Sequence, residues 1–325
     1  MRRTGSSGVV VLCRVFVCLL TLLILILAAL YGALGIVSRG PSPAARDLFV
    51  VSMLETSALK FVPSIFFDDA EIAAIVLANK IEAPEETADM DMIHIDAPDF
   101  QNEPEEKMAI VVDDVKGDRY RGKMMIVADP GRLLVGTGHD EFVEGVRGRT
   151  VEKIIERYGG IAGVNAGGFF DPDGKGDGSK PIGLVISQGR MRWGSASSRY
   201  SVIGFDAENR LVVGQMTGRE ALARGVRDAV SFGPVLMLNG VPMGVKGFGG
   251  GLNPRTAIGQ RADGAVLLLV LDGRQMNSLG ATLGDIIDVM ARYGAVNAAN
   301  LDGGSSTVMY YGGELINSCC SLYGP

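Results

Sequence analysis

Three short segments of this chain place polar side chains beside glycines, where a bound molecule could reach the backbone. They are residues 164–170 (VNAGGFF), 253–259 (NPRTAIG) and 301–307 (LDGGSST). Glycine has no side chain to hold a ligand away, so neighbouring N–H groups can contact an anion directly. An amide, a guanidinium and a carboxylate in such surroundings indicate a site for an anionic, hydroxyl-rich ligand.

Two carboxylates, Asp272 and Asp302, each follow a strand-like apolar run and precede a glycine. Cleavage of a glycosidic bond commonly uses two carboxylates, one for the leaving group and one for the anomeric side. A phosphate leaving group needs little protonation, so one carboxylate beside an anion clamp could be enough. We therefore predict that Asp302 or Asp272 directs water or stabilises oxocarbenium character. The simpler alternative is that both residues only form turns.

The predicted anion clamp consists of Arg255 and the backbone N–H groups of residues 303–306. The arginine guanidinium offers a planar pair of donors that matches phosphate, and a salt bridge within the fold is its alternative role. Asn165 can exchange hydrogen bonds with sugar hydroxyls, or it can simply stabilise a turn. We predict that Arg255 stabilises a departing phosphate and that Asn165 orients the sugar.

Other chemistries have weak support in this sequence. It contains no HExxH, GxSxG or GxxxxGK[ST] pattern, which argues against zinc proteases, α/β-hydrolases and P-loop NTPases. Residues 171–178 (DPDGKGDG) fail the EF-hand spacing, and His139 is more simply a solvated loop residue, so we predict no metal and no cofactor. The net charge is −6, and no basic stripe interleaved with aromatics is present, so nucleic acid is not an expected partner.

Two similar units lead into the first and last glycine segments. In each, a threonine caps a helix with one apolar face, a glycine ends the helix, and a short apolar strand reaches a polar residue. The units comprise residues 150–165, ending at Asn165, and 282–302, ending at Asp302. We hypothesise that their two loops meet in one cleft. The alternative is that this order of elements is merely common.

The rest of the chain from residue 108 shows short strand-like runs between turns. The pattern predicts strands at 109–112, 123–128, 133–136, 182–187, 200–205, 211–213 and 266–271. Thr217 and Glu220 predict a capping box and a short helix. With 45 glycines and few aromatics, these features predict an α+β fold, with a single mixed-sheet catalytic domain and flanking helices.

The N-terminal region carries a long uncharged apolar run at residues 15–37. This run is about long enough to span a bilayer as one helix. Three arginines precede it and only Arg39 follows closely, so the positive-inside rule places the N-terminus in the cytoplasm and the catalytic domain outside. A cleaved signal peptide is the alternative, although its apolar region is normally shorter, at roughly 7–15 residues.

The sequence therefore predicts four parts: a cytoplasmic tail (1–14), a transmembrane helix (15–37), a linker with short helices and an acidic connector (38–107), and a catalytic domain (108–325). Residues 81–107 are rich in Glu, Asp and Pro, and we expect them to form an exposed connector. The predicted location is the cell membrane, with a single pass and an extracytoplasmic domain.

Four motifs occur in order: the three glycine segments and residues 231–236 (SFGPVL). Together they resemble the phosphodiester glycosidase family, over roughly residues 108–325. Bacterial members are often described as exopolysaccharide biosynthesis proteins. The resemblance implies that Asn165, Arg255 and Asp302 line the site and that residues 231–234 form a wall. It also implies a terminal strand after the Gly-Gly-Ser loop, and the chain ends at Pro325.

The positions matching these motifs are expected to contact substrate, and they are Asn165, Gly167, Gly168, Phe169, Ser231, Gly233, Thr256, Gly303, Gly304, Ser305, Ser306 and Thr307. The resemblance implies hydrolysis of a sugar-1-phosphodiester between the anomeric carbon and its oxygen. We expect a membrane-anchored hydrolase whose partner is a phosphodiester-linked sugar or glycan of the cell envelope or an exopolysaccharide. The alternative is a non-catalytic envelope protein that binds anionic glycans. A phosphodiesterase breaking P–O bonds is disfavoured by the lack of an evident metal cluster or histidine pair.

Overall fold

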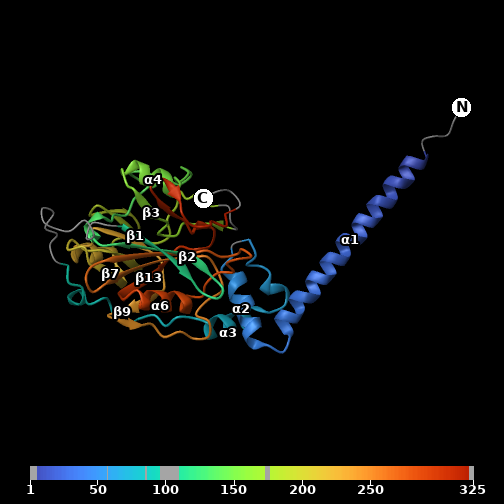
Figure 1. Ribbon diagram of the computed structural model, residues 1–325, viewed down its shortest axis with the longest axis horizontal. Helices are drawn as coiled ribbons and strands as arrows, with labels where there is room; N and C mark the ends of the chain where they lie inside the picture. Colours follow the sequence, from blue (N-terminus) through green and yellow to red (C-terminus); the bar gives the residue numbers. More distant parts are fainter. Residues whose placement is uncertain (1–5, 57, 85, 96–109, 173–175, 322–325) are drawn as a thin grey trace.

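A seven-stranded antiparallel sheet runs through the middle of the molecule (Figure 1). The computed structural model describes residues 6–56, 58–84, 86–95, 110–172 and 176–321. The strand order is β1 (Ile110–Lys116), β2 (Arg121–Val127), β12 (Val266–Leu271), β11 (Arg255–Arg261), β13 (Ala295–Leu301), β9 (Val235–Leu238) and β10 (Val241–Pro242). The central strands β12 and β13 are buried along their whole length.

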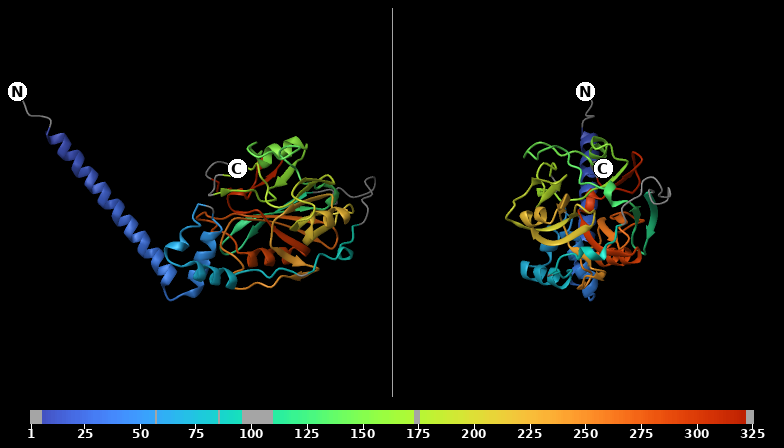
Figure 2. Two further views of the ribbon diagram at one scale, coloured as in Figure 1. Left: turned by 180° about the vertical axis from the view of Figure 1, so that it is seen from behind. Right: turned by 90° about the vertical axis from the view of Figure 1, so that its left-hand side faces the viewer.

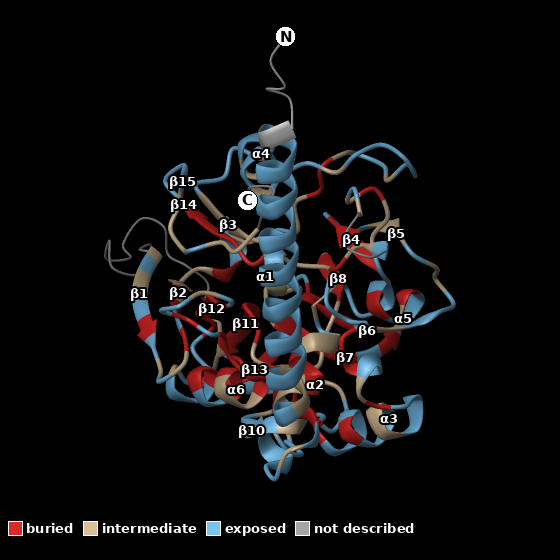
Figure 3. Ribbon diagram, turned by 90° about the vertical axis from the view of Figure 1, so that its right-hand side faces the viewer, coloured by how far each residue is buried: buried red, intermediate tan, exposed pale blue. Residues whose placement is uncertain are grey.

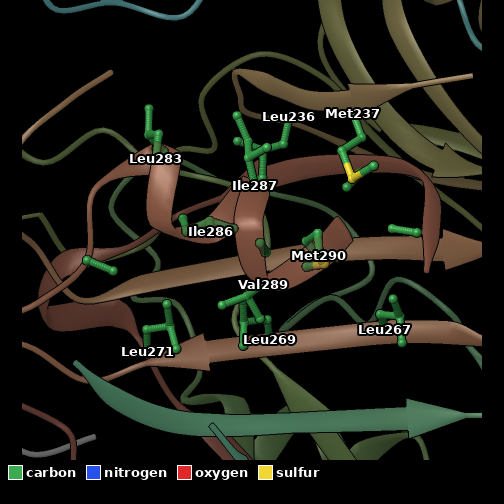
Figure 4. Close-up of a cluster of buried hydrophobic side chains, with 14 of the residues drawn as sticks. Leu236, Met237, Leu267, Leu269, Leu271, Leu283, Ile286, Ile287, Val289 and Met290 are labelled. Carbon is green, nitrogen blue, oxygen red and sulfur yellow. The ribbon is translucent and has the colours of Figure 1, made fainter. Parts of the chain in front are cut away.

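Helix α6 (Leu283–Arg292) covers one face of this sheet. Thr282 caps it as predicted, because its hydroxyl accepts from the N–H of Asp285 and the Asp285 carboxylate accepts from the N–H of Thr282. The apolar face of α6, including Ile286 and Met290, packs on alternate side chains of β12 (Figure 4). The apolar residues of the helix, which recur with its period of 3.6 residues, thus pack against every second residue of the strand in one hydrophobic layer.

A five-stranded antiparallel sheet covers the other face. Its order is β5 (Arg190–Trp193), β4 (Val185–Ser187), β8 (Asp228–Ser231), β6 (Arg199–Phe205) and β7 (Leu211–Thr217). Val266, Leu268 and Val270 of β12 point into this second core. Since β12 supplies apolar residues to both layers, its sequence is a continuous apolar run. Helix α5 (Gly218–Ala223) follows β7 with the predicted capping box of Thr217 and Glu220.

A small third sheet pairs an early strand of the domain with its last two strands. It contains β15 (Glu314–Leu315), β14 (Met309–Tyr311) and β3 (Ala162–Val164), next to helix α4 (Val151–Arg157). The strands after the Gly-Gly-Ser loop therefore pair with the strand that leads to Asn165. The predicted α+β class is confirmed, and the strands are divided among three antiparallel sheets.

Some local predictions differ from the structure. Residues 133–136 form no strand, whereas β5, β8, β9 and β11 were not predicted. Arg255 was expected to lie in a loop, but it is the first residue of β11. Gln260 of β11 is fully buried, and its side chain bonds Leu211 N, Asn209 O and Gly264 O. A buried polar residue of this kind interrupts the continuous apolar run by which a buried strand is recognised in a sequence.

The N-terminal helix α1 (Ser6–Arg39) projects away from the domain, and most of it is exposed (Figures 2 and 3). It is long and apolar enough to cross a membrane. Helices α2 (Pro43–Leu54) and α3 (Asp69–Ala78) form a small core of their own with Val50, Phe67 and Ile75. Short 3-10 turns lie at η1 (Pro63–Ile65), η2 (Met90–Met92), η4 (Pro130–Arg132) and η6 (Gly304–Ser306).

The described residues between 81 and 95 pack along the domain and differ from the expected exposed connector. Backbone N–H groups of Glu82, Ala88 and His94 bond to carbonyl groups of the domain. Ile81 and Ile93 are buried. Sequence composition misses this arrangement because a few apolar residues and backbone bonds are enough to fix a strap on a preformed surface. The remainder of the predicted connector, residues 96–107, lies outside the described residues.

Candidate active site

One end of the central sheet gathers the sequence motifs. Strand β11 is antiparallel to both of its neighbours, so its first residues lie beside the last residues of β12 and β13. Arg255 pairs with Leu271, and Thr256 pairs with Leu301. Asp272 and Asp302 follow these two partners directly. The register therefore brings a guanidinium and two carboxylates, from distant parts of the chain, to the same end of the central strands.

Asn165 joins the two glycine loops. Its Nδ2 atom donates to the carbonyl oxygen of Asp302 at 2.6 Å, and its Oδ1 atom accepts from the Thr256 hydroxyl at 2.8 Å and from Val308 N at 3.1 Å. The N–H of Asp302 also donates to the carbonyl of Ala166. The two loops are thus in contact, as hypothesised, and the cleft between them stays a prediction. Both ends of the buried amide are engaged in the fold, so its contacts indicate a positioning role.

Asp302 is partly buried, and burial changes the pKa of its carboxyl group. Its carboxylate accepts from the N–H of Gly303 at 3.0 Å and interacts with the hydroxyl of Ser306. Burial raises the pKa of Asp302 from its ordinary value of 3.8 to about 6, although these two hydrogen bonds oppose the shift. The negative charge of Asp171 raises this pKa further. A carboxylate tuned in this way can accept a proton or a developing positive charge near neutral pH.

The loop after Asp302 is held tightly against β11. Gly304 has a φ of +62°, and a Cβ atom at Gly303 would lie 2.7 Å from the carbonyl oxygen of Pro254. The N–H groups of Gly303, Gly304 and Ser306 bond within the protein, to Asp302, Pro254 and Gly303 respectively. This differs from the predicted anion nest, in which those N–H groups point to the ligand. The glycines here serve close packing and a left-handed turn.

Arg255 is buried, with 7% of its surface exposed. Its Nε atom donates to Ala281 O, and its Nη2 atom donates to Gly251 O at 2.7 Å and to the Glu55 carboxylate at 2.6 Å. These contacts match the structural salt bridge that was the alternative prediction. A direct role in phosphate binding stays a prediction.

Asn253 and Arg274 extend the Arg255–Glu55 pair into a hydrogen-bonded network that the sequence did not reveal. Asn253 connects Glu55 to Arg274, since its Nδ2 atom donates to Glu55 Oε2 at 2.7 Å and its Oδ1 atom accepts from Arg274 Nη2 at 2.8 Å. The guanidinium of Arg274 also reaches Thr56, and it lies 3.5 Å from the position that a Cβ atom of Gly304 would take. Arg274 therefore sits against the loop that follows Asp302.

The sequence gives a weak indication of the position of Arg274 and none of that of Glu55. Arg274 comes two residues after the strand-end Asp272, so its position could have been suspected. Glu55 lies in the segment before the motifs and carries no recognisable pattern. Only the packing of α2 on the loop at residues 250–253 shows its role, through the bond from Gly251 N and the contact of Gly251 with Ser52.

Asp272 fastens the C-terminal segment. Its Oδ1 atom accepts from Asn317 Nδ2 at 2.9 Å and from Ser318 N at 3.0 Å, and its carbonyl accepts from the Ser278 hydroxyl. Burial raises the pKa of Asp272, and the bonds from Asn317 and Ser318 oppose this shift. Each of the two predicted carboxylates thus accepts two hydrogen bonds, that of Asp302 from its own loop and that of Asp272 from the C-terminal segment.

The predicted wall is built by close packing. A Cβ atom at Gly168 would lie 2.9 Å from the Phe232 ring, and one at Gly167 would lie 3.1 Å from Val230. The Ser231 hydroxyl accepts from Leu184 N, and Asn300 Nδ2 donates to Gly233 O. These polar groups form hydrogen bonds within the protein, so the wall residues contribute more to the shape of the site than to its hydrogen bonding.

The remaining predicted contact residues vary in exposure. Phe169 forms an isolated bridge with Pro181. Ser305 is exposed, whereas Thr307 is buried and its hydroxyl has no hydrogen-bond partner among the described residues. Two surface hollows, of about 480 and 240 Å³, lie near Arg292 and Arg46 respectively, and neither is lined by a predicted site residue. The described part of the chain contains no group of three His, Cys, Asp or Glu residues that could hold a metal.

Comparison with known proteins adds independent findings. The family model described as phosphodiester glycosidase matches residues 158–322. Over 206 residues the chain is 28% identical to the SPbeta prophage-derived uncharacterized protein YomE of Bacillus subtilis (strain 168), a match that covers 58% of this chain and 29% of that protein. The chain thus spans less than a third of the length of this relative.

Two solved structures are also similar. The first is the catalytic domain of zebrafish N-acetylglucosamine-1-phosphodiester alpha-N-acetylglucosaminidase, auto-inhibited by its pro-peptide. It has a TM-score of 0.51 and 20% identity, over 65% of this chain and 75% of that one. The second is a putative exported protein from Burkholderia pseudomallei K96243, with a TM-score of 0.46 and 19% identity, over 63% of this chain and 72% of that one. The first likeness shows a shared fold.

Proposed function

Because the chain belongs to the phosphodiester glycosidase family, a family of hydrolases, we propose that it hydrolyses the bond between the anomeric carbon of a sugar and the oxygen of a phosphodiester. The observation that supports this most is the environment of Asp302. Its carboxylate ends a central strand, has a pKa of about 6, and adjoins a loop that contacts Arg274. A glycan-binding protein has no need of a carboxylate tuned in this way.

In the proposed reaction, Asp302 acts in its ionised form at the anomeric carbon. It directs water or stabilises the oxocarbenium character of the transition state. The departing phosphate is a stable anion, so it requires positive charge more than a proton. The guanidinium of Arg255 pairs with the carboxylate of Glu55, whereas that of Arg274 donates to neutral groups, namely the Asn253 amide oxygen, the Thr56 hydroxyl and the Glu55 backbone carbonyl. The cluster therefore retains one positive charge beside the loop of Asp302, and we assign the phosphate to Arg274.

Three further residues position this machinery. Asn165 holds the backbone of Asp302 in place. Glu55 and Asn253 set the orientations of the two arginines through the bonds described above. Asp272 holds the C-terminal segment against the same end of the sheet. These assignments give Asn165 and Asp272 supporting roles in place of direct contact with the sugar.

The proposed location is the cell membrane. Helix α1 supplies an apolar stretch that is long enough to cross a membrane, and three arginines lie near its N-terminal end. The positive-inside rule then places the domain on the outer side. A phosphodiester-linked glycan of the envelope or of an exopolysaccharide is the proposed substrate, since such polymers are available to an outward-facing anchored enzyme.

The test uses the full chain in lipid nanodiscs with a panel of sugar-1-phosphodiesters, including UDP-N-acetylglucosamine. Free sugar and a phosphomonoester are the expected products, and Asp302→Asn should abolish their release. Asp263→Asn is the matched control, because Asp263 pairs with Arg261 at the opposite end of β11. Release of a sugar phosphate would indicate P–O cleavage instead. Glycan binding without turnover, equal in the wild type and Asp302→Asn, would favour a binding protein.

A further inference from the structure

The segment between α2 and α3 exposes three large apolar side chains within seven residues. Leu59 is 41% exposed, Phe61 is 60% exposed and Ile65 is 51% exposed. The segment is nevertheless well fixed, because Val62 is buried and successive backbone bonds link residues 56, 59, 62 and 65. The structure itself thus presents these side chains to the outside. We call Leu59, Phe61 and Ile65 the apolar triad.

Contacts with α1 show the level at which this segment lies along the helix. The Phe66 ring lies 5.4 Å from the Tyr31 ring, and a Cβ atom at Gly35 would lie 3.8 Å from Phe66. At 1.5 Å per residue, Tyr31 is about 12 Å before the end of α1 at Arg39. The segment therefore lies alongside the apolar part of α1 and not beyond its end.

The last turns of α1 belong to the domain. Ser38 is buried, and Arg39 pairs with Glu71 at 2.7 Å and lies over the Phe67 ring. A hydrocarbon core of about 30 Å requires roughly 20 helical residues. Counting back from Tyr31, this length reaches Leu12 and leaves Arg14 close enough to the inner surface for its long side chain to reach the headgroups. Tyrosine is typical of the membrane–water boundary, so Tyr31 marks the outer one.

We propose that the apolar triad inserts into the outer boundary of the bilayer beside α1 and forms a second lipid contact of the domain. This inference rests on the proposed membrane anchoring of α1. It places residues 12–31 in the hydrocarbon core, in place of the predicted 15–37. Glu55 and Thr56 immediately precede the segment and contact Arg255 and Arg274. The lipid contact therefore orients the membrane-facing end of the domain, where the candidate site lies.

The experiment measures depth-dependent fluorescence quenching of the full chain in nanodiscs that contain brominated lipids. Phe61→Trp reports on the triad, and Leu23→Trp reports on the middle of α1. Val241→Trp is the matched control, since Val241 is 64% exposed on β10. The wild type, which has one tryptophan, supplies the baseline. The added emission of Phe61→Trp should be lost most with bromine near the headgroups, that of Leu23→Trp most with bromine near the chain ends, and that of Val241→Trp with neither.

Three outcomes overturn the proposal in distinguishable ways. If Leu23→Trp is quenched while Phe61→Trp matches the Val241→Trp control, α1 spans the bilayer but the triad does not touch lipid. If Leu23→Trp is not quenched, the anchoring itself fails. Shielding of Phe61→Trp from aqueous acrylamide without quenching by lipid would show that protein covers the triad, which also contradicts the proposal. Enzymatic activity of the same samples tests the proposed reaction separately.

Discussion

The carboxylate of Glu55 lies 2.6 Å from Nη2 of Arg255, and this contact joins the helix pair next to α1 to the first residue of a central strand. The side chain of Arg255 is 9% exposed and that of Glu55 is 34% exposed. The pair is thus intermediate between a surface ion pair, which contributes little, and a buried one, whose disruption is costly. The N-terminal segment is therefore part of the candidate site and not merely a tether.

Glu55→Ala is expected to lower kcat/KM about 10- to 100-fold, because Arg255 loses the carboxylate that orients it and Asn253, which holds Arg274, loses its acceptor. Glu55→Gln should lose less, since it keeps an acceptor for Arg255 and Asn253. Steady-state kinetics in nanodiscs measures both effects, with Glu82→Ala, which removes the exposed pair with Lys246, as control. A rise in activity would show instead that Glu55 competes with the substrate phosphate.

The pH dependence of activity should follow the ionisation of Asp302. Because its folded pKa is about 6 and the proposed role needs the ionised form, kcat/KM should rise through about pH 6 and level off above pH 7. Measurement between pH 4.5 and 8.5, in roughly half-unit steps, tests this expectation. A rate that falls through the same range would assign Asp302 the role of a general acid.

Asp302→Asn should increase stability while it removes activity. The unfolded carboxyl ionises near 3.8 and the folded one near 6, so the folded state binds more protons between these values. Wild-type stability therefore falls as the pH rises from about 4 to about 6, and the loss reaches about 3 kcal/mol at most above pH 7. Denaturant unfolding at pH 4 and pH 7.5 should show the variant gaining only at the higher pH. An equal difference at both pH values would contradict the raised pKa.

The two arginines should respond differently to truncation. Arg274 is exposed, so Arg274→Ala should raise KM about tenfold with little loss of stability, in line with a lost charge-assisted contact to phosphate. Arg255→Ala should lower activity and also destabilise the fold by roughly 2–4 kcal/mol, because it leaves the Glu55 carboxylate without its cationic partner and removes one donor each from the carbonyls of Gly251 and Ala281. Thermal unfolding and kinetics distinguish them, with Arg261→Ala as control. Unchanged KM in Arg274→Ala would remove it from the site.

Asp272→Ala should reduce stability more than turnover. Ser318 N would lose its acceptor and Asn317 would keep only Thr307 O, at a cost of about 1–3 kcal/mol. The kcat should stay within about threefold of the wild type because the proposed reaction needs one carboxylate. Limited proteolysis should reveal a loosened C-terminal segment. A folded Asp272→Ala variant as inactive as Asp302→Asn would restore Asp272 as a catalytic group.

The sequence by itself determined the features that depend on near neighbours. The caps at Thr150, Thr217 and Thr282 and the apolar face of α6 are read correctly, because a helix start and an amphipathic stripe are local. The runs at 266–271 and 295–301 coincide with β12 and β13. The four motifs were also enough to identify the family, which the family model confirms.

Only the tertiary structure decided how these parts make a site. The register of β11 sets Arg255 beside Leu271 and Thr256 beside Leu301, and pairing between strands distant in the chain leaves no local pattern. The bond of Glu55 to Arg255 depends on helix packing across 200 residues of sequence. The pKa of Asp302 depends on burial, which arises only when the sheets and loops enclose it. Composition could not reveal these relationships because each is a property of groups brought together by folding.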